Sequence, residues 1–262
     1  MGLLTLLAVT IQCRKDDRSI NFFTINQDIE FGQSMDSVIM ADPVQFPLLS
    51  RSLYPSAYQH LERIRDNILA SGQVYYAERL PWVMKIIDND TTLNAFAAPG
   101  GYLYFYTGII RFLDDEAEFA GVMAHEMAHC DRRHSTDVLT RQYTFAILLS
   151  ILLGDNPGQL AEIAAGLAQG LTALAFSREN EYEADQYAVK YLSHTDYDPR
   201  GLAGFFEKLH DQPTVPVFLS THPSPEDRID QIYATWELEG SKEGQRFAGR
   251  YQEFKNSLPA VR

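Results

Sequence analysis

Hydrophobic positions in the first part of the chain recur with helical spacing. Residues 27–39 and residues 57–69 each place apolar side chains on one stripe, which is typical of amphipathic helices that cover a core. A Pro-rich stretch at 42–55 separates them and marks a loop. The pattern therefore predicts two helices joined by an irregular connection.

Two short segments that follow have the composition of strands instead. Residues 82–87 and 102–106 are rich in aromatic and β-branched side chains, and turn residues at 88–90 and 99–101 bound them. We expect these two segments to pair as neighbours in one small sheet.

The next apolar stripe belongs to a central helix. Asp114 and Asp115 give its start, and apolar side chains continue on one face to about Arg133. Residues 143–174 are also apolar, but turn residues at 154–158 divide them before either half reaches the roughly 20 residues that a membrane span needs. Two short helices are predicted there, and no transmembrane helix.

Three further helices are predicted in the last third of the chain. One carries Glu181, the next begins at Asp198 with a proline after it, and the last begins near Ser224 and ends at Trp236. The charged segment that follows is expected to be a peripheral helix or a partly mobile tail. The elements together predict an α+β fold that is mostly helical, with a small antiparallel β-sheet beside the central helix.

Composition narrows the class of protein. The chain has 262 residues, 45% of them hydrophobic, which is enough for a sizeable core in one large domain or two small ones. Its formal net charge is −13 and no basic stripe is present. A nucleic-acid partner, which needs clustered Lys and Arg, is therefore not expected.

Only two cysteines occur, Cys13 and Cys130. Cys13 follows an apolar run, residues 3–11, that has the length of a signal-peptide core and is too short to cross a bilayer. We interpret residues 1–25 as a lipoprotein leader and linker, with lipid on Cys13 attaching the protein to a membrane. A frayed or buried N-terminal segment is the alternative, because no basic residues precede the run. Cys130 is expected to be a small buried hydrophobic residue.

The central helix contains a metal-binding pattern. His125 and His129 lie one helical turn apart, so both imidazoles leave the same face and can bind one ion. Glu126 projects beside them, where it can accept a proton from the attacking water without binding the metal itself. The alternative is a helix with two surface histidines, which the apolar neighbouring residues disfavour.

A catalytic zinc usually takes three protein ligands and keeps its fourth position open, so a third ligand must come from elsewhere. Glu181 is the best candidate, since Asp185, one turn later, can receive the free ring N–H of a liganding histidine. Glu179 and Glu183 point in other directions on that helix and are expected to be solvated. Helical spacing alone does not exclude either of these residues as the third metal ligand.

Four segments carry a resemblance to a known family: residues 94–101 (NAFAAPGG), 125–129 (HEMAH), 177–185 (SRENEYEAD) and 221–225 (THPSP). They resemble peptidase family M48, in the family's order, and the similarity extends from about 27 to 236. The resemblance implies a zincin fold, one Zn²⁺ per chain, Glu181 as the third ligand and Asp185 as its support. Within the family the sequence is similar to soluble bacterial envelope members related to beta-barrel assembly-enhancing proteases.

Other features near the motif have two interpretations each. Zincins align an extended substrate beside an edge strand, and the segment 102–106 is similar to that strand. In this interpretation the residues beside the substrate are Gly101, Tyr102 and Tyr104. The tyrosines are core residues in the alternative interpretation. His222 and Arg228 are candidates to stabilise the oxyanion. We also expect His222 to occupy the fourth zinc position and hold the enzyme at rest; an exposed histidine on a capping loop is the alternative.

The predicted function is that of a zinc-dependent endopeptidase. Its domain would comprise residues 26–240, followed by a peripheral segment, residues 241–262, and its substrates would be unfolded or misassembled proteins of the bacterial cell envelope. It would face the periplasm or be a surface lipoprotein. The rivals are a non-proteolytic, chaperone-like zinc protein and a zinc hydrolase that acts on a small amide or a peptidoglycan stem. Glu126 argues against the first, because a structural zinc site is closed by four protein ligands and needs no carboxylate beside it.

Overall fold

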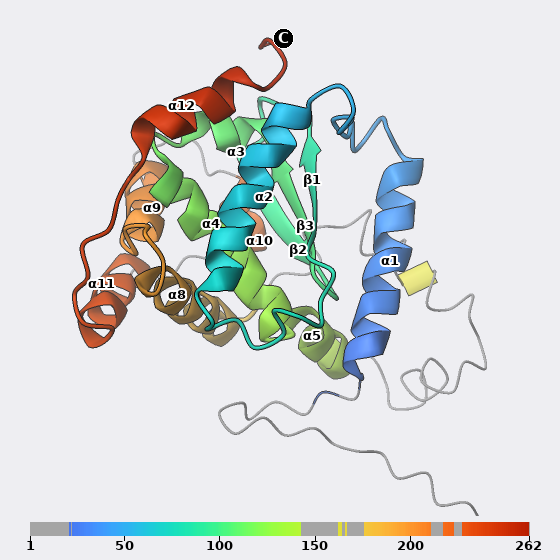
Figure 1. Cartoon of the computed structure of the whole chain (residues 1–262). Helices are drawn as coiled ribbons and strands as arrows, with labels where there is room; N and C mark the ends of the chain where they lie inside the picture. The colour runs from blue at the N-terminus through green and yellow to red at the C-terminus, as the bar shows by residue number, and fades with distance from the viewer. Residues whose placement is uncertain are drawn as a thin grey trace, which may run out of the picture.

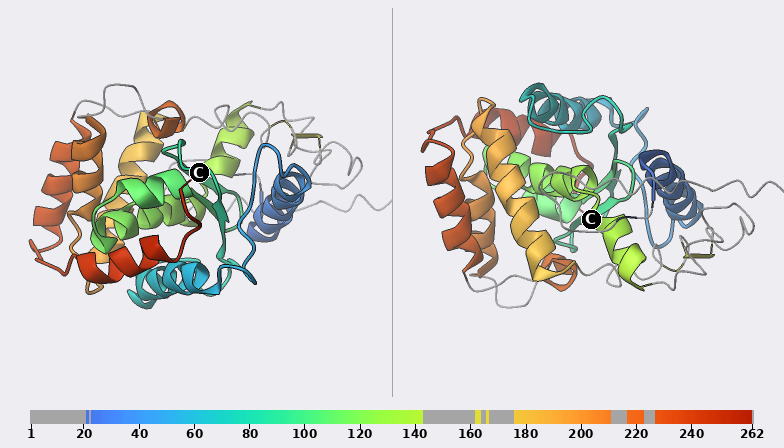
Figure 2. Two further views of the ribbon diagram at one scale, coloured as in Figure 1. Left: turned by 90° about the horizontal axis from the view of Figure 1, so that it is seen from above. Right: turned by 90° about the horizontal axis from the view of Figure 1, so that it is seen from below.

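A three-stranded sheet lies between helices in the computed structural model, which describes residues 21, 23–142, 162–163, 166, 176–210, 217–222 and 227–261. Helix α1 (Ile25–Ala41) covers one face of the sheet and α4 (Glu116–Asp131) the other (Figures 1 and 2). Alternate side chains of each strand enter two hydrophobic clusters, one on each face. Both faces are therefore buried, as the apolar composition of the strands indicates.

The strand order decides which backbone edges are available. The strands are β1 (Val83–Ile87), β2 (Ala95–Ala98) and β3 (Tyr102–Tyr106), in the order β1-β3-β2. β3 runs parallel to β1 and antiparallel to β2. The predicted α+β fold, mostly helical with a small sheet, is confirmed, but the sheet is mixed and not antiparallel. The reason is that the connection after β1 crosses to the far edge before the tight β2–β3 hairpin returns the chain beside β1.

The interpretation of residues 102–106 as a substrate edge is corrected by this order. β3 has a hydrogen-bonded neighbour on each side, and all five of its residues are buried. The Tyr104 hydroxyl donates a hydrogen bond to Asp36 Oδ1 of α1 at 2.7 Å, and the Tyr102 ring packs against Gly32 of the same helix. Tyr102 and Tyr104 are thus core residues, and Gly101 forms the hairpin turn with φ of 88°.

The remaining helices surround α4. They are α2 (Pro55–Ala70), α3 (Thr107–Phe112), α5 (His134–Gln142), α8 (Arg178–Ser193), α9 (Gly201–His210), α10 (Val217–Thr221), α11 (Arg228–Leu238) and α12 (Ala248–Asn256). Figure 2 shows α8, α9 and α11 on the side of α4 that faces away from α1. The helices predicted at 27–39, at 57–69, after Asp115 and around Glu181 are confirmed. The last two predicted starts were early, because α9 begins at Gly201 and α11 at Arg228.

Every residue of α4 is buried, because helices and sheet enclose it. A Cβ at Gly121 would lie 2.6 Å from the backbone nitrogen of Leu202, and one at Gly201 would lie 2.1 Å from the carbonyl oxygen of Ala117. Two glycines therefore permit α4 and α9 to approach closely. Polar side chains on α4 are held away from bulk water by this packing.

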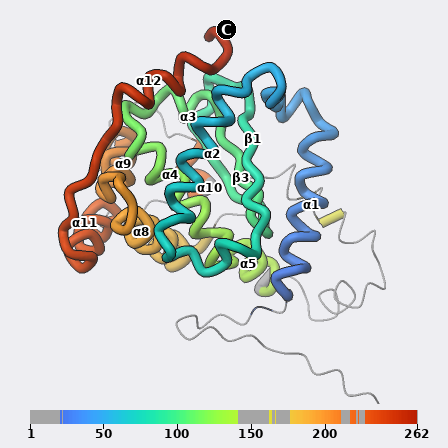
Figure 3. Tube along the Cα trace, in the orientation of Figure 1, coloured from blue at the N-terminus to red at the C-terminus, as the bar shows by residue number. Residues whose placement is uncertain are grey.

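The C-terminal segment returns to the body of the molecule (Figure 3). Tyr251 and Phe254 of α12 are fully buried and contact Phe119 of α4. Glu116 of α4 accepts hydrogen bonds from Arg63 of α2 and Arg250 of α12. These contacts tie α2, α4 and α12 together.

In the part of the chain that the structure describes, no helix has both the length and the apolar character needed to cross a bilayer. Cys13 with its apolar run, and most of residues 143–174, lie outside the described residues. The lipidation of Cys13 therefore stays a prediction.

Candidate metal centre

The two histidines of the motif face the same point inside the molecule. α4 begins after Asp115, whose side chain accepts a hydrogen bond from the Glu118 backbone N–H and so caps the helix. Two turns further on, the Nε2 atoms of His125 and His129 lie 3.0 Å apart. Both side chains are fully buried, so the alternative of two surface histidines is wrong.

Glu181 reaches this point from a different helix. Ser177 and Asn180 form a capping box that starts α8, which fixes the first turn where Glu181 lies. Its carboxylate oxygens are 3.4 Å from His125 Nε2 and 3.5 Å from His129 Nε2. The carboxylate is fully buried, so two segments far apart in the sequence meet here.

His222 joins the same cluster from the segment after α10. One ligand atom from each of His125, His129, Glu181 and His222 lies within 4.8 Å of the others. His222 is 1% exposed, and its ring stacks on Phe218 with 4.3 Å between centroids. The alternative of an exposed histidine on a capping loop is therefore wrong.

These distances fit a bound metal ion. Two atoms that each lie 2.0–2.1 Å from one ion can be at most about 4 Å apart, and the contacts among His125, His129 and Glu181 are 3.0, 3.4 and 3.5 Å. The carboxylate oxygens of Glu126 are buried and make no hydrogen bond within the described residues, and the buried Glu181 carboxylate faces the Nε2 atoms of both histidines. Buried carboxylates of this kind are costly without a compensating cation. The residues present therefore fit a divalent metal.

Glu126 lies next to the cluster. It is fully buried, and its Oε1 is 3.4 Å from His222 Nε2. Burial raises its pKa to about 8, so the carboxyl group can both accept and release a proton near neutral pH. This is the property that a general acid–base group needs.

Protons and a metal ion compete for the cluster. Burial opposes the charged form of His125, but hydrogen bonds to Asp185 and Glu181 outweigh burial and raise its pKa to about 9. For Glu181, burial favours the neutral carboxyl group, yet the electrostatic influence of His222 and Arg228 outweighs burial and lowers its pKa. A metal ligand must be a neutral imidazole or a carboxylate, so binding a cation here displaces protons, above all from His125.

Asp185 and Arg228 make hydrogen bonds and ion pairs with the clustered residues His125 and Glu181. His125 Nδ1 is 2.8 Å from Asp185 Oδ1, as predicted from the spacing on α8. The buried Arg228 donates to both oxygens of Asp185 at 2.5 and 2.8 Å and lies 3.0 Å from Glu181 Oε2. Arg228 thus holds two carboxylates in place, and only its Nη1 has no hydrogen-bond partner among the described residues.

The sequence did not predict that three residues, His134, Glu183 and Phe176, surround His129. His134 Nδ1 is 2.9 Å from His129 Nδ1, and Glu183 contacts His134 Nε2 at 3.1 Å. Glu183 was expected to be solvated, but it is engaged by His134 and Arg132. Phe176 stacks on the His129 ring with 3.9 Å between centroids. The only feature of the sequence that pointed to these contacts was a third histidine, His134, five residues after His129.

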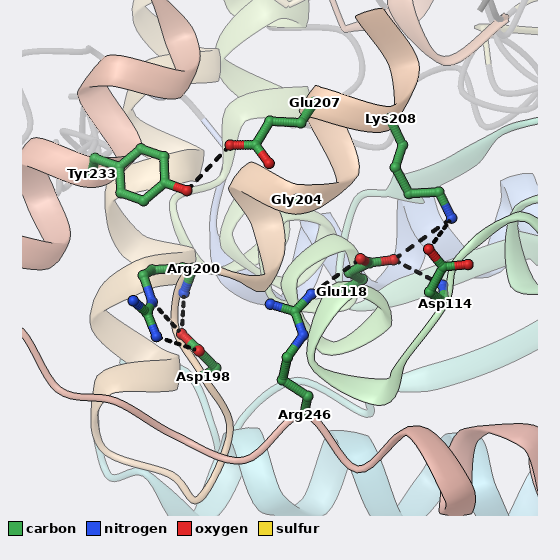
Figure 4. A pocket seen from close by; sticks show the side chains of 9 residues that line it. All are labelled: Asp114, Glu118, Asp198, Arg200, Gly204, Glu207, Lys208, Tyr233 and Arg246. Carbon is green, nitrogen blue, oxygen red and sulfur yellow. Dashed lines mark hydrogen bonds and ion pairs between the residues drawn. The ribbon is translucent and has the colours of Figure 1, made fainter. Parts of the chain in front are cut away.

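A polar pocket of about 530 Å³ lies towards the other end of α4 (Figure 4). Its charged side chains pair with one another: Asp198 with Arg200, and Glu118 with Arg246. None of the four clustered residues lines it. The pocket is a network of ion pairs and is separate from the candidate metal centre.

Comparisons with known proteins match the sequence to one family. Residues 55–235 match peptidase family M48. The chain is 31% identical over 190 residues to the beta-barrel assembly-enhancing protease of Yersinia pestis, covering 67% of the chain and 38% of that protein. Its identity to the protein of the same name in Escherichia coli (strain K12) is 35% over 166 residues, covering 58% of the chain and 34% of that protein.

A mitochondrial relative is also similar. The chain is 34% identical over 179 residues to the mitochondrial metalloendopeptidase OMA1 of Schizosaccharomyces pombe, covering 66% of the chain and 51% of that protein. The chain thus spans about a third of the length of the two bacterial relatives and about half of this one. The family match covers well over half of the chain and includes His125, His129, Glu181 and Arg228. The chain therefore belongs to peptidase family M48.

Proposed function

We propose that this protein is a zinc-dependent endopeptidase. The observation that carries the proposal is the meeting of Glu181 with the histidine pair of α4, with the buried Glu126 carboxylate beside them. Family membership and relatives named as metalloendopeptidases support it. We assign their activity to this chain only as a proposal, because the chain spans only part of their length.

In this proposal one Zn²⁺ is held by His125, His129 and Glu181. Imidazole and carboxylate groups are the donor set of catalytic zinc sites, which use three protein ligands. When bound, zinc supplies a Lewis acid that polarises the scissile carbonyl and increases the acidity of a water molecule. Asp185 fixes the tautomer of His125 by accepting its Nδ1–H.

The chain's own residues then move the protons and stabilise charge. Glu126 accepts the proton of the attacking water and returns it to the leaving amine. The unpartnered Nη1 of Arg228 is the group that we assign to the oxyanion. Because β3 is internal, β2 takes the role of substrate edge: within the described residues it pairs with β3 alone, and it packs against α4.

We propose polypeptides as the substrates, and more narrowly unfolded or misassembled proteins of the bacterial cell envelope. The support for the narrower statement is the printed name of the bacterial relatives, beta-barrel assembly-enhancing protease. A lipidated Cys13 would attach the protein to a membrane on the periplasmic side or at the surface. The net charge of −13 gives no support for a nucleic-acid partner.

We also propose that His222 latches the enzyme at rest. Phe218 N–H donates to the carbonyl of Leu93 at 3.1 Å, two residues before β2 begins, so α10 lies close to where the chain enters the proposed substrate edge. From there it places His222 at the metal ligands. A latch that occupies the fourth position of the metal blocks the position that water and substrate need.

Replacing His222 with alanine is expected to increase proteolysis. If the latch is closed in about 90% of the molecules, its loss raises casein cleavage about tenfold. His210→Ala, which changes an exposed histidine of α9, is the control. Unchanged cleavage by His222→Ala would refute the latch, and reduced cleavage would instead favour His222 as an oxyanion donor.

Metal analysis combined with a protease assay tests the proposed function. Purified protein is expected to contain about one zinc per chain, to cleave casein, and to lose cleavage when a chelator removes the metal. Added Zn²⁺ should restore it. Protein that contains no metal, or that keeps cleaving after the metal is gone, would refute the proposal.

A further inference from the structure

The two histidines that point at the metal centre differ in what holds their second ring nitrogen. His125 Nδ1 contacts the Asp185 carboxylate at 2.8 Å. His129 Nδ1 contacts another imidazole, His134 Nδ1, at 2.9 Å. His134 Nε2 lies 3.1 Å from Glu183 Oε2. The other Glu183 oxygen accepts a hydrogen bond from Arg132 Nε at 2.5 Å, so a chain of three side chains leads to His129.

The contacts allow only one arrangement of protons when His129 binds a cation. A liganding His129 uses the lone pair of Nε2, so its proton sits on Nδ1 and is donated to His134 Nδ1. His134 then carries its own proton on Nε2 and donates it to the Glu183 carboxylate. Each group in the chain has a donor facing an acceptor, and no bond breaks or forms.

The backbone conformation before His134 holds this residue next to His129. Arg133 has φ of 64°, in the left-handed region, and this turns the chain between α4 and α5 so that His134 lies back over His129. Arg133 donates to both carboxylate oxygens of Asp28 at 2.6 and 3.0 Å, which anchors the corner to α1. Phe176 stacks on the His129 ring and limits its rotation.

We propose that His134 is a positioning residue that fixes the tautomer and the ring orientation of His129, with Glu183 and Arg132 orienting His134 in turn. The inference rests on the proposed function in one respect, namely that the cluster binds a metal. The expected consequence is a tighter metal site, because partners that hydrogen-bond to a liganding histidine typically contribute about 10–100-fold to metal affinity.

His134→Phe tests this role, because phenylalanine keeps a flat ring but cannot accept the His129 proton. Its zinc dissociation constant, measured by competition with a chromogenic chelator, is expected to rise about 10–100-fold. His134→Asn places an amide oxygen near the lost Nδ1 and should recover much of the affinity. His210→Phe, at an exposed histidine, should bind zinc like the wild type.

Two further measurements separate positioning from general stability. The visible spectrum of the Co²⁺-loaded protein should change in His134→Phe and be largely restored in His134→Asn, because the spectrum reports ligand geometry. The unfolding midpoints of all variants in excess chelator show whether the metal-free fold is intact. Should His134→Phe fail to fold, Glu183→Gln replaces it, with a smaller expected loss of zinc affinity, since a neutral amide oxygen accepts more weakly than a carboxylate.

The outcomes distinguish this inference from the proposed function. A wild-type protein that binds no zinc would overturn both. A wild type that binds zinc tightly, together with folded His134→Phe or Glu183→Gln proteins of unchanged zinc affinity and Co²⁺ spectrum, would overturn the positioning role alone.

Discussion

Replacing Glu126 with glutamine is expected to lower kcat for casein cleavage by about 10²–10⁴-fold, the contribution of a positioned general acid–base group. Glutamine has nearly the same shape but cannot accept the proton of the attacking water. Glu126 is buried beside the cluster and makes no hydrogen bond within the described residues, so no structural bond within them is lost. The measurement is the initial rate at saturating casein.

Zinc content and fold provide the control for this variant. Glu126→Gln should still contain about one zinc per chain, and Glu237→Gln, an equal change at an exposed position of α11, should cleave like the wild type. Equal casein cleavage by Glu126→Gln and the wild type would contradict the assignment. Absence of cleavage by the wild type, with zinc bound, would favour the non-proteolytic, chaperone-like rival.

Glu181→Ala is expected to lose both the metal and the activity. The substitution removes one of the three proposed ligands, so zinc affinity should fall by more than the roughly 100-fold that loss of a supporting residue can cost. The stability of the metal-free protein should fall by less than the zinc affinity does, since Arg228 keeps its ion pair with Asp185 when its contact with Glu181 is lost. Zinc titration and chelator-treated unfolding curves measure the two effects.

Glu179→Ala is the matched control for Glu181→Ala, because Glu179 lies on the same first turn of α8 and is exposed. It should bind zinc and cleave casein normally. The ligand assignment is wrong if Glu181→Ala retains wild-type zinc affinity while Glu179→Ala or Glu183→Ala loses it. That result would mean that a different acid of α8 completes the site.

Burial changes the interpretation of two residues that the sequence analysis named, His222 and Arg228. His222 was expected near the metal, and the structure adds that it is 1% exposed and held by Phe218. Arg228 was expected at the oxyanion, and the structure shows that most of its guanidinium binds Asp185 and Glu181. An arginine between two buried carboxylates stabilises the site, because either carboxylate alone would be costly.

The strand that was misplaced illustrates a limit of sequence patterns. Residues 102–106 were correctly predicted as a strand, since aromatic residues in short alternating runs favour extended structure. Their position inside the sheet depends on where the chain crosses after β1, and the residues of the strand itself do not encode that crossing. A central strand and an edge strand can therefore have the same local composition.

The sequence by itself determined the long helices α1, α2, α4 and α8, the one-turn spacing of His125 and His129, and the placement of Glu126 beside them, because helical periodicity is a local property of consecutive residues. It did not predict the short helices α3, α5 and α10. Only the tertiary structure decided that β3 is internal, that His222 is buried at the cluster, and that His134 and Glu183 hold His129. Those features arise from contacts between residues distant in the chain, which depend on how the helices pack around α4.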